Sequence, residues 1–176
     1  DFYMHRTAVF ILERWKQYSE AEELLTDLLS EHAAELYLYR DLAWVYYQQQ
    51  KYQQAVDLLY KGINVNFGSD EARQAGLKAV LLNDMNAMIE LHRATLDLSA
   101  INPTLIKALS ADLLIVAEDN ERSGLNLQIN EPGVQSMVLY GHPSKNGGFV
   151  TTEKNSAYVY GSASGIETYT IQTASK

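Results

Sequence analysis

A short block of residues recurs after 34 positions, and this recurrence constrains the fold of the chain more than any other feature. Residues 18–25 and 52–59 have Tyr, Ala, Leu and Leu at the same four places. A fixed period of this length indicates stacked structural units, because each unit buries its apolar face only against its neighbours. The recurrence therefore predicts helical hairpins packed side by side in the first part of the chain.

The second copy has the alternation of large and small residues that two antiparallel helices require. Ala43 and Ala55 are the small residues at which the helices approach closely, and tyrosines and leucines fill the space around them. The period and the pattern are similar to those of the tetratricopeptide repeat. The matching positions are Tyr39, Leu42, Ala43, Tyr46, Tyr52, Ala55, Leu59 and Gly62. In the first copy only the second half follows the pattern, so we expect its opening helix to be degenerate or a cap.

Two repeats leave an apolar face of the second hairpin open, since about three are usually needed for a stable stack. Apolar residues at helical spacing predict a third helix over Asp70–Leu91, which covers this face. Pro103 marks the end of the helical pattern, because it lacks a backbone donor and disfavours the α conformation in the residue before it.

The composition changes near residue 110. Only three of the ten glycines lie in residues 1–109, whereas residues 110–176 alternate short β-branched and aromatic runs with Gly, Asn, Ser and Pro clusters. This alternation is typical of short strands joined by turns, and it predicts strands at 112–118, 125–130, 137–140, 149–151, 157–159 and 167–173. We therefore predict an α+β fold in two segregated parts, a tetratricopeptide-like helical domain over 1–109 and a small antiparallel β-sandwich over 110–176.

Residues 36–176 resemble, as an ordered series of motifs, the helical region and following domain of the bacterial YfaP-like β-domain family of unknown function. The motifs are Tyr39–Ala43, Tyr52–Tyr60, Leu82–Ile89, Ile101–Leu105, Asp112–Val116, Leu125–Pro132, Tyr140–His142 and Gly165–Ile171. In such proteins this region lies at the C-terminal end of a longer chain with vault/inter-alpha-trypsin and von Willebrand A-like domains. The resemblance implies an exported bacterial protein in the periplasm or at the cell surface. The family pattern continues after Lys176 with a further strand, so we expect the β-domain here to lack its last strand or to pair it differently.

No constellation of residues predicts catalysis. The chain has no cysteine, and its four histidines are dispersed and form no HExxH motif, so zinc and cysteine chemistry have no support. No serine has the strand-to-helix context of a nucleophile elbow. The acidic run at 118–121 is the best metal candidate, but it lacks the EF-hand spacing, and we interpret it as a solvated turn. The sequence thus predicts no enzyme, no cofactor and no metal site.

The charge balance restricts the partners. With 14 basic and 22 acidic residues the chain has a formal charge of −8, which opposes binding to nucleic acid and to anionic membranes. No apolar run approaches the length of a membrane span. We therefore expect a non-enzymatic interaction module whose partner is a protein or peptide segment, or another domain of the same chain.

Two sets of residues are candidates for binding. Tetratricopeptide-like grooves bind peptides through rows of side chains on the inner helices, and the residues predicted here are Tyr39, Trp44 and Tyr47, with Arg40 for an acidic group. The alternative is a β-sandwich accessory domain that binds carbohydrate or calcium through its loops. Its candidate residues are Glu118, Asp119, Tyr140 and His142.

Overall fold

The computed structural model describes residues 2–108, 113–119, 127–131, 144, 149–152 and 165–171. The chain divides into two compact units, Asp1–Ala108 and Leu109–Lys176. The first is called the helical unit below. That the two parts are independently folding domains, with limits at 1–109 and 110–176, stays a prediction.

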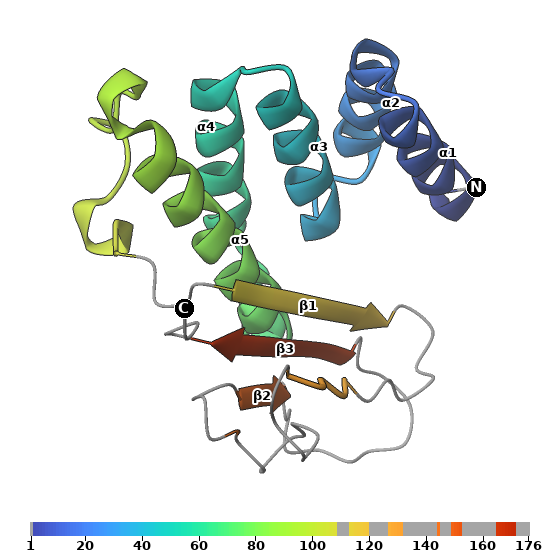
Figure 1. The fold of residues 1–176 in the computed structure, drawn as a ribbon. Helices are drawn as coiled ribbons and strands as arrows, with labels where there is room; N and C mark the ends of the chain where they lie inside the picture. Colours follow the sequence, from blue (N-terminus) through green and yellow to red (C-terminus); the bar gives the residue numbers. More distant parts are fainter. Residues whose placement is uncertain are drawn as a thin grey trace. The chain divides into compact units, whose positions relative to one another are not determined.

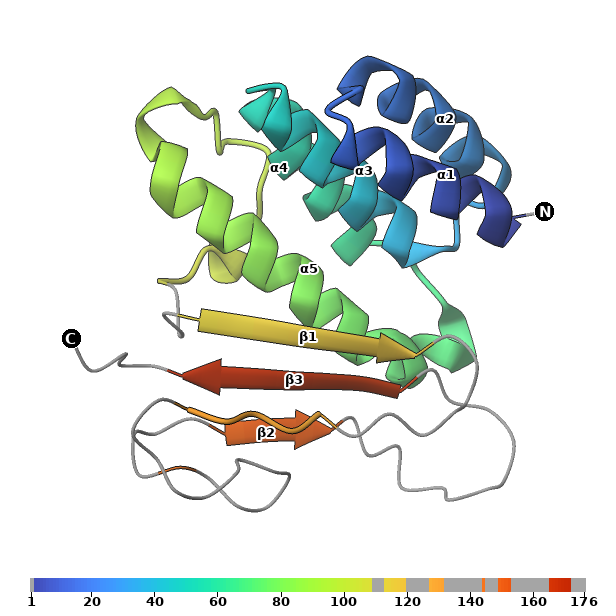
Figure 2. The ribbon, with the colours of Figure 1, turned by 45° about the vertical axis from the view of Figure 1, so that its right-hand side comes forward.

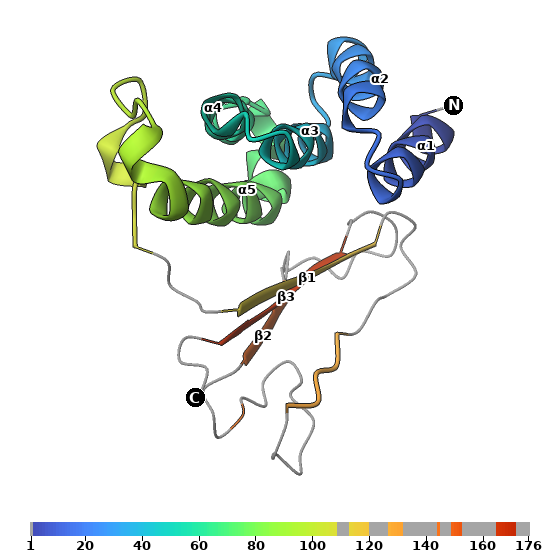
Figure 3. The ribbon, with the colours of Figure 1, turned by 45° about the horizontal axis from the view of Figure 1, so that its top comes forward.

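The helical unit contains five α-helices among its described residues, arranged as two hairpins and a long last helix (Figure 1). They are α1 (Phe2–Arg14), α2 (Tyr18–Glu31), α3 (Leu36–Gln48), α4 (Tyr52–Ile63) and α5 (Glu71–His92). Single-turn 3₁₀ segments are η1 (Gly68–Asp70), η2 (Arg93–Thr95) and η3 (Pro103–Leu105). Within the helical unit, α1, α3 and α5 form one layer and α2 and α4 form the other (Figure 3).

The 34-residue period is also present in the backbone of the two hairpin turns. Lys16 and Gln50, which are 34 positions apart, have φ angles of 59° and 61° in the left-handed region. The residue that follows each of them, Gln17 or Lys51, donates its N–H to a carbonyl of the preceding helix at 2.9 Å. This is the Schellman arrangement, in which glycine usually occupies the left-handed position. Both hairpins therefore turn in the same way, each with a residue that this conformation disfavours.

Gln50→Gly is expected to raise the free energy of unfolding by about 0.5 to 1 kcal/mol, because glycine adopts a positive φ without the steric cost of a Cβ atom. Urea denaturation followed by far-ultraviolet circular dichroism measures the change. The control is Gln54→Gly at an exposed position inside α4, which should lower the free energy of unfolding by about 1 kcal/mol. Equal losses in both variants would contradict the left-handed turn.

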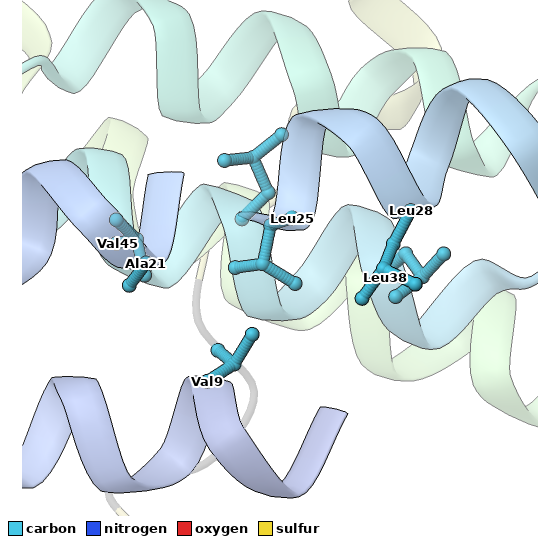
Figure 4. Packing of buried hydrophobic residues seen from close by; sticks show 7 residues of the cluster. Val9, Ala21, Leu25, Leu28, Leu38 and Val45 are labelled. Atoms are coloured by element: carbon cyan, nitrogen blue, oxygen red, sulfur yellow. The ribbon is translucent and has the colours of Figure 1, made fainter. Parts of the chain in front are cut away.

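Apolar side chains between the two layers form the core. Ala21 and Ala55, which occupy the same place in the two copies, are fully buried, as is Ala43. The small residues thus lie where the helices approach closely, which confirms the predicted helical hairpins. Figure 4 shows the cluster that joins α1, α2 and α3, which consists of Val9, Ala21, Leu25, Leu28, Leu38, Leu42 and Val45.

α5 packs against α4 and covers the second hairpin, as predicted. The buried side chains of α5 include Leu77, Val80, Leu81, Met85 and Ile89. Gly62 of α4 lies at a close approach of three helices, because a Cβ atom at this position would be 2.6 Å from Leu81 Cδ2 and 3.0 Å from Tyr39 Cβ. Packing of Gly62 against both α3 and α5 therefore explains why the repeat pattern has a small residue at this position.

A buried amide holds the segment that follows α5. Asn86 Nδ2 donates to the carbonyl oxygens of Leu82 at 2.9 Å and Leu105 at 3.0 Å. Its Oδ1 accepts from the N–H of Lys107 at 2.7 Å. These bonds compensate the cost of burying a polar side chain and fix the end of the helical unit on α5.

The predicted β-sandwich, and with it the predicted α+β fold class, is wrong. The described residues are mostly helical, and the strands among them form one antiparallel sheet in the order β1-β3-β2 (Figure 2), with no second sheet in the described part of the chain. The strands are β1 (Leu113–Asp119), β2 (Phe149–Thr152) and β3 (Gly165–Ile171). β1 pairs with β3 along its whole length, from Leu113 opposite Ile171 to Asp119 opposite Gly165.

Alternation of apolar and polar residues is the source of this error. It predicts strands with one buried face, but it does not specify whether a second sheet covers that face. In residues 125–130, which we expected to be a strand, the described part has an isolated bridge at Ile129. Leu127 and Ile129 pack against Ile171 of β3. The strands predicted at 137–140 and 157–159 lie outside the described residues.

Candidate functional site

A groove of about 490 Å³ lies on the layer of α1, α3 and α5, and it is called the inner groove below. Its aromatic and apolar lining includes Phe10, Trp44, Tyr47, Met88 and Leu91, and its charged lining consists of Glu13, Arg40, Asp41 and Asp84. On α3 the lining positions 40, 44 and 47, and on α5 the positions 84, 88 and 91, have the spacing i, i+4, i+7. Residues at this spacing share one helix face, so each inner helix presents one stripe to the groove.

Aromatic rings form one continuous group at one end of the inner groove. The rings of Trp44 and Tyr47 are stacked, with centroids 5.8 Å apart and an interplanar angle of 12°. Tyr47 contacts the edge of His92 at 5.6 Å, and His92 is stacked on Tyr52 at 3.6 Å. Trp44 is nevertheless 47% exposed. The group thus holds the Trp44 ring in place while leaving much of it accessible to a ligand.

Ion pairs join neighbouring inner helices along the groove. Arg40 Nε lies 2.7 Å from Asp84 Oδ2, so α3 is paired with α5. Arg6 Nε lies 2.7 Å from Asp41 Oδ2, so α1 is paired with α3, and both of these side chains are largely buried. In each pair the arginine comes from one inner helix and the aspartate from the next. The positive charges of both arginines are therefore balanced within the helical unit.

Glu13 is the charged lining residue contributed by α1. Burial raises the pKa of its carboxyl from 4.5 to about 7, the negative charge of Asp41 acts in the same direction, and Arg6 opposes both. Its Oε1 atom is buried and has no hydrogen-bond partner in the described part of the chain. The inner groove thus has a carboxyl group that is about half ionised near neutral pH and is not satisfied by the protein.

The structure places three of the four predicted groove residues in the inner groove. Arg40, Trp44 and Tyr47 all line it. Tyr39 does not, because its side chain is 2% exposed and its hydroxyl donates to the carbonyl oxygen of Ala33 at 2.9 Å. Tyr39 precedes Arg40 by one position, which turns it about 100° away toward the core.

The role predicted for Arg40 stays a prediction. We expected it to bind an acidic group of the partner, but its guanidinium already contacts Asp84. Asp84 lies 44 positions later in the sequence, and no local pattern predicts that the two side chains meet. An incoming carboxylate would compete with this pair and would also approach the other acidic residues of the groove.

Half of the second predicted set of binding residues falls outside the described residues. Tyr140 and His142 lie outside them entirely. Glu118 and Asp119 belong to β1, which extends to Asp119, so the backbone there is a strand where we expected a turn to begin. Among the described residues, no three histidine or acidic side chains gather as a metal site would require. Within the same residues, no helix has both the length and the apolar character of a membrane span.

Sequence reasoning missed α1 as a wall of the groove. Arg6 and Arg40 are 34 positions apart, and so are Phe10 and Trp44. The recurrence thus includes positions that face the groove, and this signal could have placed α1 in the wall of the groove. That α1 is a degenerate first helix or a cap stays a prediction. Glu13 had no such signal, because Tyr47 stands 34 positions after it.

Comparison with protein families supports the helical part of this description. Residues 16–81 match the tetratricopeptide repeat family. The helical unit is therefore tetratricopeptide-like. Repeats of this kind commonly mediate protein–protein interaction and are generally not catalytic. The match begins at the turn after α1, and the structure adds α1 as the helix that completes the first tetratricopeptide-like hairpin. No curated protein and no solved structure matches the chain.

Proposed function

We propose that the helical unit is a non-enzymatic interaction module that binds a protein segment in the inner groove. The observation that supports this proposal best is the exposed ring of Trp44, which is stacked on Tyr47 and stands between two inner helices. An aromatic side chain that is already held in place loses little conformational entropy on binding, and tryptophan is among the residues that contribute most to interfaces. The position of Trp44 therefore favours a role as an anchor for a partner.

The surroundings of Trp44 fit an apolar segment. Leu91 is 68% exposed at the rim of the groove, and Met88 and Ala87 line the wall next to it. Methionine side chains adapt to differently shaped partners. A volume of about 490 Å³ accommodates several side chains of a bound peptide.

The longer protein to which the chain belongs, and its location, are proposed from the YfaP-like resemblance of residues 36–176 alone. In this proposal the chain belongs to a longer exported or surface-associated bacterial protein, located in the periplasm or at the cell surface. The partner is then a separate protein or another domain of the same chain. A carbohydrate- or calcium-binding β-sandwich is not proposed, because the described strands form a single sheet.

Trp44→Ala is expected to weaken peptide binding at least about 30-fold, because the anchor ring is removed. The test is a selection of short displayed peptides on the wild-type chain, followed by fluorescence anisotropy titrations of the selected peptides. Trp15→Ala is the matched control, since Trp15 is 69% exposed but does not line the inner groove. Equal affinities for both variants, or a failure of the wild-type chain to select any peptide, would contradict the proposed function.

A further inference from the structure

We propose that the segment bound in the inner groove presents a lysine or arginine side chain to the carboxyl group of Glu13, with apolar residues beside it against Trp44 and Met88. This inference rests on the proposed function and specifies the chemistry of the partner. It differs from the expectation drawn from Arg40, which was an acidic partner.

The charges that line the inner groove favour a basic side chain. The lining includes one basic residue, Arg40, and three acidic residues, Glu13, Asp41 and Asp84. Each aspartate is held by an arginine at 2.7 Å. Among the described residues, Glu13 is thus the acidic lining residue that forms no ion pair with an arginine. A cationic side chain meets an unmatched negative charge there, whereas an anionic one meets three carboxyl groups.

The geometry around Glu13 also requires a hydrogen-bond donor. Its Oε1 atom is buried and no described donor contacts it, so the ionised carboxyl gains no hydrogen bond on that side. A cation placed against the part of the carboxyl that lines the groove would offset this cost of ionisation. An ammonium or guanidinium group supplies several donors together with the opposite charge, and such charge-assisted bonds are stronger than neutral ones.

Occupation of this site by a cation would couple binding to protonation. Only the ionised form of Glu13 forms an ion pair, and the pKa of this carboxyl in the free protein is about 7. A basic peptide would therefore bind about tenfold more tightly at pH 8 than at pH 6, because the ionised fraction increases about tenfold over this range. A peptide in which norleucine replaces the basic residue should show no such dependence.

The groups that face Glu13 allow this effect to be assigned. Arg6 on α1 and Asp41 on α3 are paired with each other, and across the groove Asp84 of α5 is paired with Arg40. His92 of α5 lies against Tyr47, which lines the groove. His92→Asn therefore serves as a separate variant, in which the pH dependence should persist.

The decisive experiment is a peptide-display selection at pH 8 on three chains, namely the wild type, Glu13→Gln and Glu20→Gln. Glu20 is exposed on α2, in the other layer, so its variant makes the same change in net charge away from the groove. We expect basic residues flanked by apolar ones to be enriched on the wild type and on Glu20→Gln. On Glu13→Gln the apolar residues should remain enriched and the basic residue should not.

Titrations of one selected peptide complete the test. Glu13→Gln should weaken binding of the basic peptide by more than about tenfold at pH 8 and abolish the difference between pH 6 and pH 8. The variant should unfold no more easily than the wild type at pH 8, since it removes a carboxylate whose ionised form burial disfavours. Selected peptides without basic residues, or a pH dependence that survives in Glu13→Gln, would overturn this inference alone. Failure of the wild type to select any peptide would instead overturn the proposed function.

Discussion

Leu25→Ala is expected to lower the free energy of unfolding of the helical unit by about 2 to 5 kcal/mol. The side chain is fully buried and belongs to the cluster that joins α1, α2 and α3 (Figure 4). Its truncation removes apolar contacts and leaves a cavity that rigid neighbours on three helices fill only partly. Urea denaturation followed by tryptophan fluorescence measures the change, because both tryptophans of the chain, Trp15 and Trp44, lie in the helical unit.

The matched control for this prediction is Leu91→Ala. It makes the same chemical change on a helix, but Leu91 is 68% exposed, so its effect on stability should be within about 0.5 kcal/mol. Similar losses of stability in the two variants would contradict the packing of α1, α2 and α3 described above.

Gly62→Ala is expected to lower the free energy of unfolding by about 1 to 3 kcal/mol, although alanine favours a helix over glycine by about 1 kcal/mol. The added Cβ would lie 2.6 Å from Leu81 Cδ2 and 3.0 Å from Tyr39 Cβ and Cγ. Leu81 and Tyr39 are both buried, and the atoms of Tyr39 stand next to its backbone, so neither side chain has room to move away. Chemical denaturation of the purified chain gives the free energy directly.

A double-mutant cycle identifies the cause of this loss. Leu81→Ala alone should be destabilising, because it creates a cavity in the α4–α5 contact. Combined with Gly62→Ala it should cost less than the sum of the two single changes, since the methyl group of the new alanine enters the space that Leu81 Cδ2 leaves. Strictly additive effects, or a gain of stability in Gly62→Ala, would show that the helices do not approach at Gly62 as described.

The hairpins of the helical unit were predictable because their signals are local and repeated. Ala21 and Ala55 are both small because consecutive helices approach closely at these positions. This close approach recurs after 34 residues. The helix α5 was predictable as well, because its buried residues Leu77, Val80, Leu81, Met85 and Ile89 have helical spacing over a stretch long enough to exclude a strand. Helix periodicity depends on neighbours within a few positions, so one sequence is enough to reveal it.

The inner groove was predictable only in part. Arg40, Trp44 and Tyr47 fall on one helix face, and spacing alone brings them together. Arg40 of α3 forms an ion pair with Asp84 of α5, and Asp41 of α3 helps to raise the pKa of Glu13 of α1. Such pairings require the register of one helix against the next. The sequence contains the charges but not their distances, so it suggested an acidic ligand, whereas we propose a basic one from the surroundings of Glu13.

The sequence by itself thus determined the helical hairpins, their period and the face of α3 that is open to a partner, because each of these follows from interactions between residues close in the chain. Tertiary structure alone decided that Tyr39 is a core residue, that α1 forms a wall of the groove and that the Oε1 atom of Glu13 is buried with no hydrogen-bond partner among the described residues. It also decided that β1 pairs with β3 in a single sheet, where alternation had suggested a sandwich. Burial, ion pairing and strand partners all depend on which distant segments meet, and that is determined by the packing of the whole chain.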